Sequence, residues 1–321
     1  MSPDREPQRQ LSVVIPVYRS AATLPDVCRR VLAVLEGEGL SHELILVDDG
    51  SPDESWERIV ALHGEFPDRI VAIQLMRNFG QHNALMCGLR RARGDVIVTL
   101  DDDLQHPPEE IPKLLAALRE RSLDLVYGSY EEKRHGRFRN AGSRVLRTLF
   151  RSLFRIDVDF SAFRAMRREL ARSIFTYDLN FTFLDGLLAW NTTRIGDVPV
   201  RHDARGDGRS GYSLSRLLLL SLNMLTNFSL VPLQAVSLFG LFAAGGGLAL
   251  ASYFLFSALA GGVAVPGYAS IIVAVLVLGG VQLLALGIIG EYLGRVHLNI
   301  NRKPQFVERQ MLGREPDDAS D

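Results

Sequence analysis

The sequence predicts an α/β fold with a doubly wound, mainly parallel sheet, followed by a hairpin of two transmembrane helices. Between residues 11 and 130, short apolar runs alternate with segments of helical periodicity, the pattern of successive strand–helix units in a parallel sheet. Two long uncharged apolar runs then follow in the last third of the chain. The 321 residues exceed the needs of one ordinary domain, and the net charge of -1 gives no reason to expect nucleic acid as a partner.

Each predicted strand is a short apolar run bounded by polar or turn residues, and each predicted helix has apolar residues at helical spacing. The predicted strands cover residues 11–17, 43–47, 70–75, 96–100 and 123–127. The predicted helices cover residues 21–35, 53–63, 81–91 and 108–120. Residues 1–10 are polar and rich in charge and proline, and we expect them to be disordered. They do not resemble a signal peptide, so we expect the first domain to stay in the cytoplasm.

Polar clusters fall at the carboxyl ends of four predicted strands, at 16–18, 48–51, 77–81 and 101–105. Ligands of open α/β sheets bind in the crevice outside these strand ends. The shared location predicts one binding site there. Neither a GxxxxGK[ST] loop nor a GxGxxG sequence follows a strand, which argues against a P-loop kinase and a dinucleotide dehydrogenase.

Three carboxylates, Asp101, Asp102 and Asp103, follow the buried strand at 96–100. Carboxylates in this position repel one another and lose hydration, and a bound divalent cation would neutralise their charge. Residues i and i+2 of an extended segment point the same way, so Asp101 and Asp103 can share an ion to which Gln105 adds a third oxygen. These hard ligands suit Mg²⁺ or Mn²⁺ beside a substrate diphosphate. A solvated acidic turn that caps the next helix is the alternative.

The end of the second strand is a candidate site for a nucleotide base. Asp49 can accept the ring N–H of uracil or guanine, although an ordinary turn with a helix N-cap explains the same residues. The two cysteines, Cys28 and Cys87, lie far apart in helical or buried patterns. They indicate a reducing compartment rather than a disulfide framework.

The two apolar runs, 231–260 and 268–293, are each long enough to cross a hydrocarbon core of about 30 Å as a helix. The connector at 261–267 lacks Lys and Arg, whereas the outer flanks contain Arg216, Arg295, Arg302 and Lys303. By the positive-inside bias, both ends of the hairpin are cytoplasmic. Adjacent glycines in both runs permit close helix packing, which leaves a homo-oligomer open.

Arginines recur at spacings of three and four between residues 139 and 155, opposite a set of apolar residues. This pattern is typical of a basic amphipathic helix in a membrane interface. A solvated helix on a protein core is the alternative. Residues 213–230 show a similar apolar pattern and lead directly into the first predicted span.

Several motifs occur in a fixed order: VDDGS at 47–51, RNFGQ at 77–81, DDDLQHPP at 101–108, ARGDGRSGYS at 204–213, two spans, and GEYLGR at 290–295. This order resembles the family-2 inverting glycosyltransferases that load polyprenyl phosphates. That family includes dolichol-phosphate mannose synthase, bactoprenol glucosyltransferase and undecaprenyl-phosphate formamido-arabinose transferase. The resemblance covers residues 11–305.

The resemblance implies a GT-A fold with a nucleotide-sugar-binding core at 11–138, an acceptor-side region at 139–230, the two spans within 231–294, and a cytoplasmic tail at 295–321. It also implies roles for residues that match the family motifs. The expected metal ligands are Asp101, Asp103 and Gln105; the donor-binding residues are Pro16, Tyr18, Asp48, Asp49, Asn78, Asp102, Arg205 and Ser210; the acceptor-phosphate residues are Arg137, Arg139 and Ser143; and the catalytic residues are Asp103, Asp159 and Arg205.

Three positions depart from the family pattern. Tyr130 stands where many relatives have Arg, so Arg134 or Arg137 would have to substitute. Gly211 stands where many have Lys. Ala162 stands where some relatives have an Asp that is assigned as the catalytic base. The identity of a base in this chain is therefore open. A phosphate monoester is mostly dianionic at neutral pH, so the acceptor needs alignment more than deprotonation.

We therefore expect an enzyme that transfers a sugar, with inversion, from a nucleotide sugar to undecaprenyl phosphate. We expect this transfer to depend on Mg²⁺ or Mn²⁺ and to take place at the cytoplasmic face of the bacterial inner membrane. The product would serve cell-envelope glycan synthesis or lipid A modification. A UDP-sugar is the favoured donor. The alternatives are a GDP-mannose-using enzyme like dolichol-phosphate mannose synthase, a processive polysaccharide synthase, and a non-catalytic membrane adaptor on a transferase fold.

Overall fold

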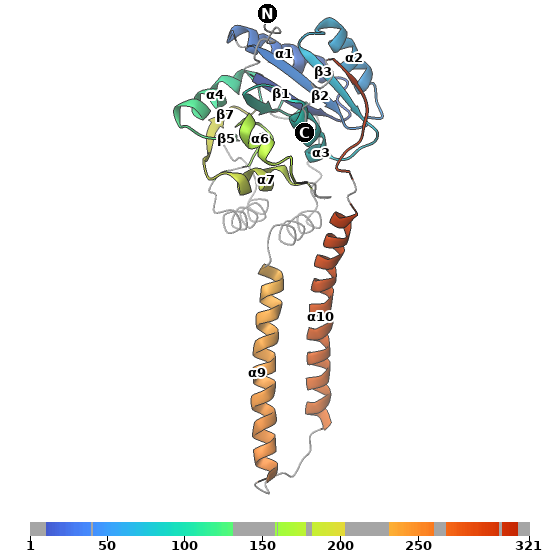
Figure 1. Ribbon diagram of the computed structural model, residues 1–321, viewed down its shortest axis with the longest axis vertical. Coiled ribbons are helices and arrows are strands. Elements are labelled where there is room, and N and C mark those ends of the chain that lie inside the picture. Colours follow the sequence, from blue (N-terminus) through green and yellow to red (C-terminus); the bar gives the residue numbers. More distant parts are fainter. Residues whose placement is uncertain are drawn as a thin grey trace, which may run out of the picture. The chain divides into compact units, whose positions relative to one another are not determined.

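The computed structural model describes residues 11–39, 41–130, 158, 160–177, 182–202, 231–259, 268–301 and 304–313. The chain divides into two compact units. One unit comprises Met1–Gly211 together with Lys303–Asp321, and the other comprises Tyr212–Arg302. The first unit carries an α/β sheet, and the second carries two long helices (Figure 1).

Eight strands and eight α-helices make up the described part of the chain. The strands are β1 (Leu11–Val17), β2 (His42–Asp48), β3 (Ile70–Leu75), β4 (Val96–Thr99), β5 (Leu125–Tyr130), β6 (Arg164–Arg167), β7 (Ile195–Val200) and β8 (Glu308–Leu312). The helices are α1 (Leu24–Gly37), α2 (Ser55–Glu65), α3 (Gln81–Arg91), α4 (Ile111–Glu120), α6 (Arg168–Ser173), α7 (Leu184–Asn191), α9 (Val231–Leu259) and α10 (Tyr268–Ile300), with a 3₁₀ turn at Pro108–Glu110 before α4.

The strands form a single sheet in the order β7-β5-β6-β4-β1-β2-β3-β8. Its centre is parallel, because β1 pairs in parallel with both β2 and β4, and β2 pairs in parallel with β3. β5 and β7 are also parallel, whereas β6 and β8 run antiparallel to their neighbours. The predicted α/β class with a mostly parallel sheet is therefore confirmed, as expected for a GT-A fold.

Helices cover both faces of the sheet, so the apolar strands are buried on both sides. On one face, Val13 and Ile15 of β1 belong to a hydrophobic cluster with Leu24 and Val31 of α1. On the other face, a Cβ atom added to Gly88 of α3 would lie 2.4 Å from Cγ1 of Val14. Alternate residues of β1 thus face opposite layers, which explains why the predicted strands appear as unbroken apolar runs.

The sequence did not predict β6, β7 or β8. β8 lies in the segment 295–321 that we expected only as a tail, and it pairs antiparallel with the edge strand β3. Leu312 of β8 packs against the hydrophobic core, and Glu308 forms an ion pair with Arg91 of α3 at 2.8 Å. The chain that leaves the α/β unit before α9 therefore returns to the same sheet after α10.

The second unit contains α9, with 29 residues, and α10, with 33 residues. Within α10, Val277–Gly294 is long and apolar enough to cross a membrane by length and composition. Within α9, Leu233–Ala249 is a shorter apolar stretch. One candidate span is therefore found among the described residues, where two were expected.

Candidate nucleotide-sugar site

A cavity of about 480 Å³ opens at the carboxyl edge of the central strands. Loops that follow β1, β2, β3 and β4 supply its walls, as the strand-end rule for open α/β sheets predicts. The lining residues are Pro16, Val17, Tyr18, Ser20, Asp49, Asn78, Gly80, Gln81, Asp101, Asp102 and Asp103. The structure thus brings together seven of the predicted site residues: Pro16, Tyr18, Asp49, Asn78 and the three aspartates of the triplet.

The acidic triplet turns into this cavity instead of continuing β4. Our expectation of an extended segment with strict i, i+2 alternation is wrong, because β4 ends at Thr99 and the chain turns at Asp102 and Asp103. Leu104 then adopts a positive φ of 60°, which an extended strand does not contain. All three carboxylates therefore line the same cavity, although each has different hydrogen-bond partners.

Asp102 is tied to the loop after β1. Its Oδ2 atom accepts a hydrogen bond from the backbone N–H of Tyr18 at 3.2 Å, and its backbone carbonyl accepts one from the Thr23 hydroxyl at 2.8 Å. Burial raises the pKa of the Asp102 carboxyl above its usual value. The Asp101 Oδ1 atom instead accepts from Gln81 Nε2 at 2.6 Å, and Asp103 Oδ1 accepts from the backbone N–H of Gln105 at 3.1 Å.

Asp101 and Asp103 supply some of the oxygen ligands that a hard divalent cation needs, but not all of them. Both carboxylates line the cavity, and their Oδ1 atoms accept hydrogen bonds from two uncharged groups, the Gln81 amide and the Gln105 backbone N–H. Gln105 is not among the lining residues, so its role as a ligand stays a prediction. No group of three or more His, Cys, Asp or Glu side chains in the described ranges is arranged to hold a metal alone. A cation here would need further oxygens, such as those of a substrate diphosphate.

The loops after β2 and β3 are locked together by Asp49. Its Oδ1 and Oδ2 atoms accept hydrogen bonds from the backbone N–H groups of Phe79 at 2.7 Å and Gly80 at 2.8 Å. Gly50 has a φ of +65°, and a Cβ atom there would lie 2.5 Å from the carbonyl carbon of Arg77. Only glycine permits this close approach in that conformation. Burial raises the pKa of the Asp49 carboxyl, and its role toward a nucleotide base stays a prediction.

Asp48 lies at the end of β2 and is fully buried, but it does not line the cavity. Its carboxylate accepts hydrogen bonds from the backbone N–H of Ser51 at 3.1 Å and from Gln74 Nε2 at 3.3 Å. These contacts fix the turn that carries Asp49 and Gly50. The structure therefore gives Asp48 a supporting role in the turn, while its predicted contact with the donor is not tested.

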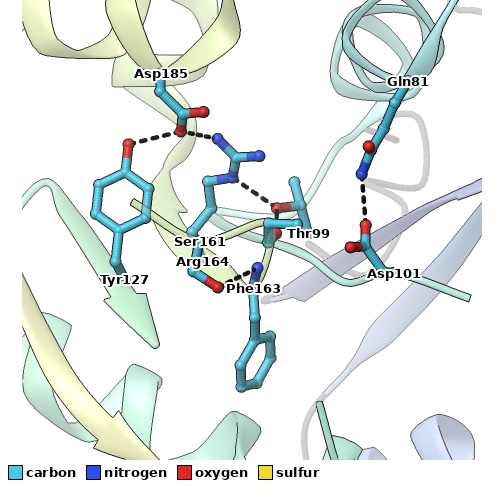
Figure 2. Close-up of polar contacts among 9 residues, drawn as sticks. Gln81, Thr99, Asp101, Tyr127, Ser161, Phe163, Arg164 and Asp185 are labelled. Atoms are coloured by element: carbon cyan, nitrogen blue, oxygen red, sulfur yellow. Dashed lines mark hydrogen bonds and ion pairs between the residues drawn. The ribbon is translucent and has the colours of Figure 1, made fainter. Parts of the chain in front are cut away.

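A buried polar network lies beside the triplet, and the sequence did not predict that its residues pair. Arg164 of β6 is 2 % exposed and forms an ion pair with Asp185, in the first turn of α7. Its Nε atom donates to the Thr99 hydroxyl at 3.0 Å, and the Tyr127 hydroxyl donates to Asp185 Oδ1 at 2.9 Å. Figure 2 shows these four residues, which we call the buried network, together with Gln81 and Asp101.

His106 lies next to this network and is buried. Its ring contacts the rings of Phe163 and His202, with centroids 5.4 Å and 5.6 Å apart. Its Nε2 atom lies 3.3 Å from the Ser161 hydroxyl. Burial, together with the nearby His202, lowers the pKa of His106 to about 4. His106 is therefore a neutral packing partner at neutral pH.

Six predicted site residues lie outside the described residues. They are Arg137, Arg139, Ser143, Asp159, Arg205 and Ser210. Among the lining residues that we did not predict, Ser20 and Gln81 lie at or near helix starts close to the strand ends. Gln81 belongs to the polar cluster at 77–81, which is the signal that could have identified it.

Sequence comparison assigns the chain to a known family. Residues 12–175 match the model of glycosyl transferase family 2. The chain belongs to this family and is a glycosyltransferase that uses a nucleotide sugar. It is 34% identical over 313 residues to proteins of Salmonella dublin and Salmonella enteritidis named undecaprenyl-phosphate 4-deoxy-4-formamido-L-arabinose transferase, covering 96% of this chain and 95% of those proteins.

The sheet also resembles solved structures. Glucosyl-3-phosphoglycerate synthase from Mycobacterium tuberculosis, in complex with Mn²⁺, UDP and phosphoglyceric acid, superimposes with a TM-score of 0.49 at 23% identity. The match covers 68% of this chain and 76% of that one. The complex of the same enzyme with Mn²⁺ and UDP-glucose gives a TM-score of 0.48 at 24% identity, with coverage of 68% and 77%.

Proposed function

We propose that this protein transfers a sugar from a UDP-sugar to undecaprenyl phosphate, with inversion at the anomeric carbon. The observation that carries the proposal is the cavity at the carboxyl edge of the sheet, which the ends of four strands and all three triplet carboxylates line. Its volume of about 480 Å³ lies in the range of small-molecule sites. The 34% identity to undecaprenyl-phosphate transferases over 96% of the chain supports the acceptor.

Different residues are assigned to different parts of the donor. Pro16, Tyr18 and Asn78 line the part of the cavity formed by the loops after β1 and β3, and we assign the nucleoside to them. Asp101 and Asp103 would hold Mg²⁺ or Mn²⁺, which when bound supplies charge neutralisation for the leaving nucleoside diphosphate. Asp102 orients the triplet through its hydrogen bond to Tyr18 and is not needed as a ligand.

The acceptor side rests on residues outside the described part of the chain. We assign the lipid phosphate to Arg139 and Ser143, with Arg137 nearby in sequence, and the closing of the donor site to Arg205 and Ser210. An oxygen of the phosphate attacks the anomeric carbon while the bond to the nucleoside diphosphate breaks, so the configuration inverts. The phosphate is mostly dianionic at neutral pH, so alignment by arginines suffices without a base on Asp159.

The position of β8 supports a hairpin of two membrane spans. β8 pairs with β3, so residues 308–312 lie on the same side of a membrane as the rest of the sheet. A chain that leaves and returns on one side crosses an even number of times. If Val277–Gly294 of α10 is one crossing, a second must precede it, and the uncharged α9 of 29 residues is long enough at about 1.5 Å per residue.

The orientation follows from the charged flanks. Arg216 precedes α9 in the sequence and Arg295 lies near the end of α10, whereas the connector between α9 and α10 has no Lys or Arg. The positive-inside bias places the α/β unit and both termini in the cytoplasm of a bacterial inner membrane. The product, a sugar linked to undecaprenyl phosphate, would then serve the synthesis of a cell-envelope glycan or the modification of lipid A.

A donor panel tests this function. The full-length protein is incubated with undecaprenyl phosphate, Mg²⁺ or Mn²⁺, and labelled UDP- and GDP-sugars, and label extracted into organic solvent is counted. The panel includes UDP-4-deoxy-4-formamido-L-arabinose, because the similar Salmonella proteins carry that sugar in their name. Transfer from a UDP-sugar is the expected result. Transfer from GDP-mannose alone would show that the donor is GDP-mannose and not a UDP-sugar. No transfer from any donor would contradict the proposal.

A further inference from the structure

The exposed apolar side chains of the α/β unit gather beside one short segment. Among the described residues of this unit, the exposed large hydrophobic side chains are those of Tyr18, Val60, Met76, Trp190 and Val307. Tyr18 lines the donor cavity. Met76, Trp190 and Val307, which are 50 %, 46 % and 40 % exposed, lie in or beside residues 305–307, by which the chain returns from α10 to the sheet. Apolar side chains that gather in this way mark an interaction surface more often than scattered ones do.

Hydrogen bonds and ring contacts join these side chains to the return segment, residues 305–307. The backbone N–H of Met76 donates to the carbonyl oxygen of Val307 at 2.8 Å. Gln305 is buried, and its Nε2 atom donates to the carbonyl oxygen of Tyr177 at 3.0 Å. The ring of Tyr177 lies 6.2 Å from the ring of Trp190, which belongs to the last turn of α7. The three exposed residues are therefore linked through one segment.

An exposed arginine at the end of α3 lies beside the same segment. The guanidinium of Arg90 lies 5.8 Å from the ring centre of Phe306 and 5.6 Å from that of Phe175. Its Nη2 atom donates to the carbonyl oxygen of Phe175 at 3.4 Å. We call the whole set the return patch: Met76, Arg90, Tyr177, Trp190, Phe306 and Val307. It combines indole and phenol rings with apolar side chains and a cation, the residue types that are enriched where a protein meets lipid headgroups.

The chain tethers this patch to the proposed membrane span. The candidate span ends at Gly294, and α10 continues to Ile300. Six helical residues rise by about 9 Å, and the five residues from Ile300 to Gln305 reach at most about 18 Å. Gln305 must then lie within about 27 Å of the end of the span. Among the described residues of the α/β unit, those that Gln305 and Phe306 contact are thus held close to the bilayer by a short tether.

We propose that the return patch contacts the surface of the lipid bilayer, with the Trp190 indole among the headgroups and Arg90 directed at anionic lipid. This inference rests on the proposed function, because it takes α10 to cross a membrane. It gives the exposed Trp190 a role that the transfer of the sugar does not require. It also identifies the face of the α/β unit that is turned toward the membrane, from which a polyprenyl phosphate would arrive.

The two tryptophans of the chain, Trp56 and Trp190, make the test direct. The full-length protein is placed in nanodiscs of anionic lipid with or without bromine on the upper acyl chains, since bromine quenches an indole only at short range. In Trp56→Phe, Trp190 is the only fluorescent indole. We expect brominated lipid to cause roughly a twofold loss of its emission, because an interfacial indole lies next to the upper acyl chains.

Trp190→Phe is the matched control, because it leaves Trp56 as the only indole. Trp56 belongs to α2 and packs against the hydrophobic core. We expect brominated lipid to leave its emission unchanged. If Trp56→Phe does not fold, the difference in quenching between the wild type and Trp190→Phe reports on Trp190 instead.

Iodide, which quenches from water, distinguishes the other possible surroundings of Trp190. Emission that brominated lipid leaves unchanged and iodide quenches would show that Trp190 faces water. Emission that neither quencher reduces would show that protein covers it, such as a second copy of the chain. Either result would overturn the inference. A protein that does not enter nanodiscs at all would contradict the proposed membrane hairpin, a failure that is distinct from an inserted protein with an unquenched Trp190.

Discussion

Asp49 holds Gly80: its Oδ2 atom accepts a hydrogen bond from the Gly80 backbone N–H at 2.8 Å, and its Oδ1 atom accepts one from Phe79 at 2.7 Å. The end of β2 thereby fixes the loop after β3, which forms one wall of the cavity. Both carboxylate oxygens of Asp49 are engaged within the protein. A contact with a nucleotide base would have to use their remaining lone pairs.

We expect Asp49→Asn to lower both stability and UDP affinity. The amide cannot accept both backbone hydrogen bonds, and a hydrogen bond to a charged group contributes about 1.5–3 kcal/mol. Chemical denaturation measures the free energy of unfolding, and calorimetry measures UDP binding. Asp26→Asn on the exposed face of α1 is the matched control, with little change expected in either quantity. Weaker UDP binding with unchanged stability would show that Asp49 acts on the base and not on the loop.

The half-buried carboxyl of Asp102 makes stability depend on pH. Burial raises its pKa above the usual 3.8, so the folded state binds the proton more tightly than the unfolded state does. This contribution to stability is fully present below the unfolded pKa and is lost as the pH rises through the folded pKa. We expect Asp102→Asn to gain stability relative to the wild type as the pH rises from about 4 to about 7. Parallel Tm curves for the two proteins would contradict this.

β8 should stabilise the sheet although it lies near the end of the chain. Ending the chain after residue 303 removes its pairing with β3, the packing of Leu312 and the Arg91–Glu308 ion pair. It also exposes the edge of β3, and unpaired edges promote aggregation. We expect a lower Tm and loss of soluble protein during purification in detergent. Ending the chain after residue 313 keeps β8 and is the control; equal behaviour of the two truncations would contradict the role of β8.

Local pattern predicted the centre of the fold because β1–β4 and α1–α4 follow apolar periodicity that tertiary contacts do not override. It failed at β6, which begins with Arg164: this buried charge is compensated by Asp185, 21 positions later. It failed at β8 because that edge strand is mostly polar and contains no buried residue, and its partner β3 lies far away in the sequence. Such long-range compensation leaves no periodic signal.

In the site, too, local sequence pattern predicted some features, while contacts between distant residues determined the others. The strand-end rule located Pro16, Tyr18, Asn78 and the acidic triplet, because loops at the carboxyl edge of a parallel sheet converge whatever their sequence. The conformation of the triplet was not predictable by alternation, since the turn at Asp102 and Asp103 depends on hydrogen bonds from the distant Tyr18 and Thr23. The partners of Asp101 and Asp185 likewise come from other elements.

We propose that Asp101 and Asp103 serve a metal-dependent sugar transfer to a polyprenyl phosphate. The most direct measurement is the initial rate at which labelled sugar from the UDP-sugar that the donor panel selects enters organic-extractable undecaprenyl phosphate, in Asp103→Asn, Asp102→Asn and the wild type. We expect a metal-dependent rate in the wild type, a decrease of about 100-fold or more in Asp103→Asn, and a much smaller decrease in Asp102→Asn. A folded Asp103→Asn protein with the wild-type rate would contradict the assignment of Asp103 to the metal site.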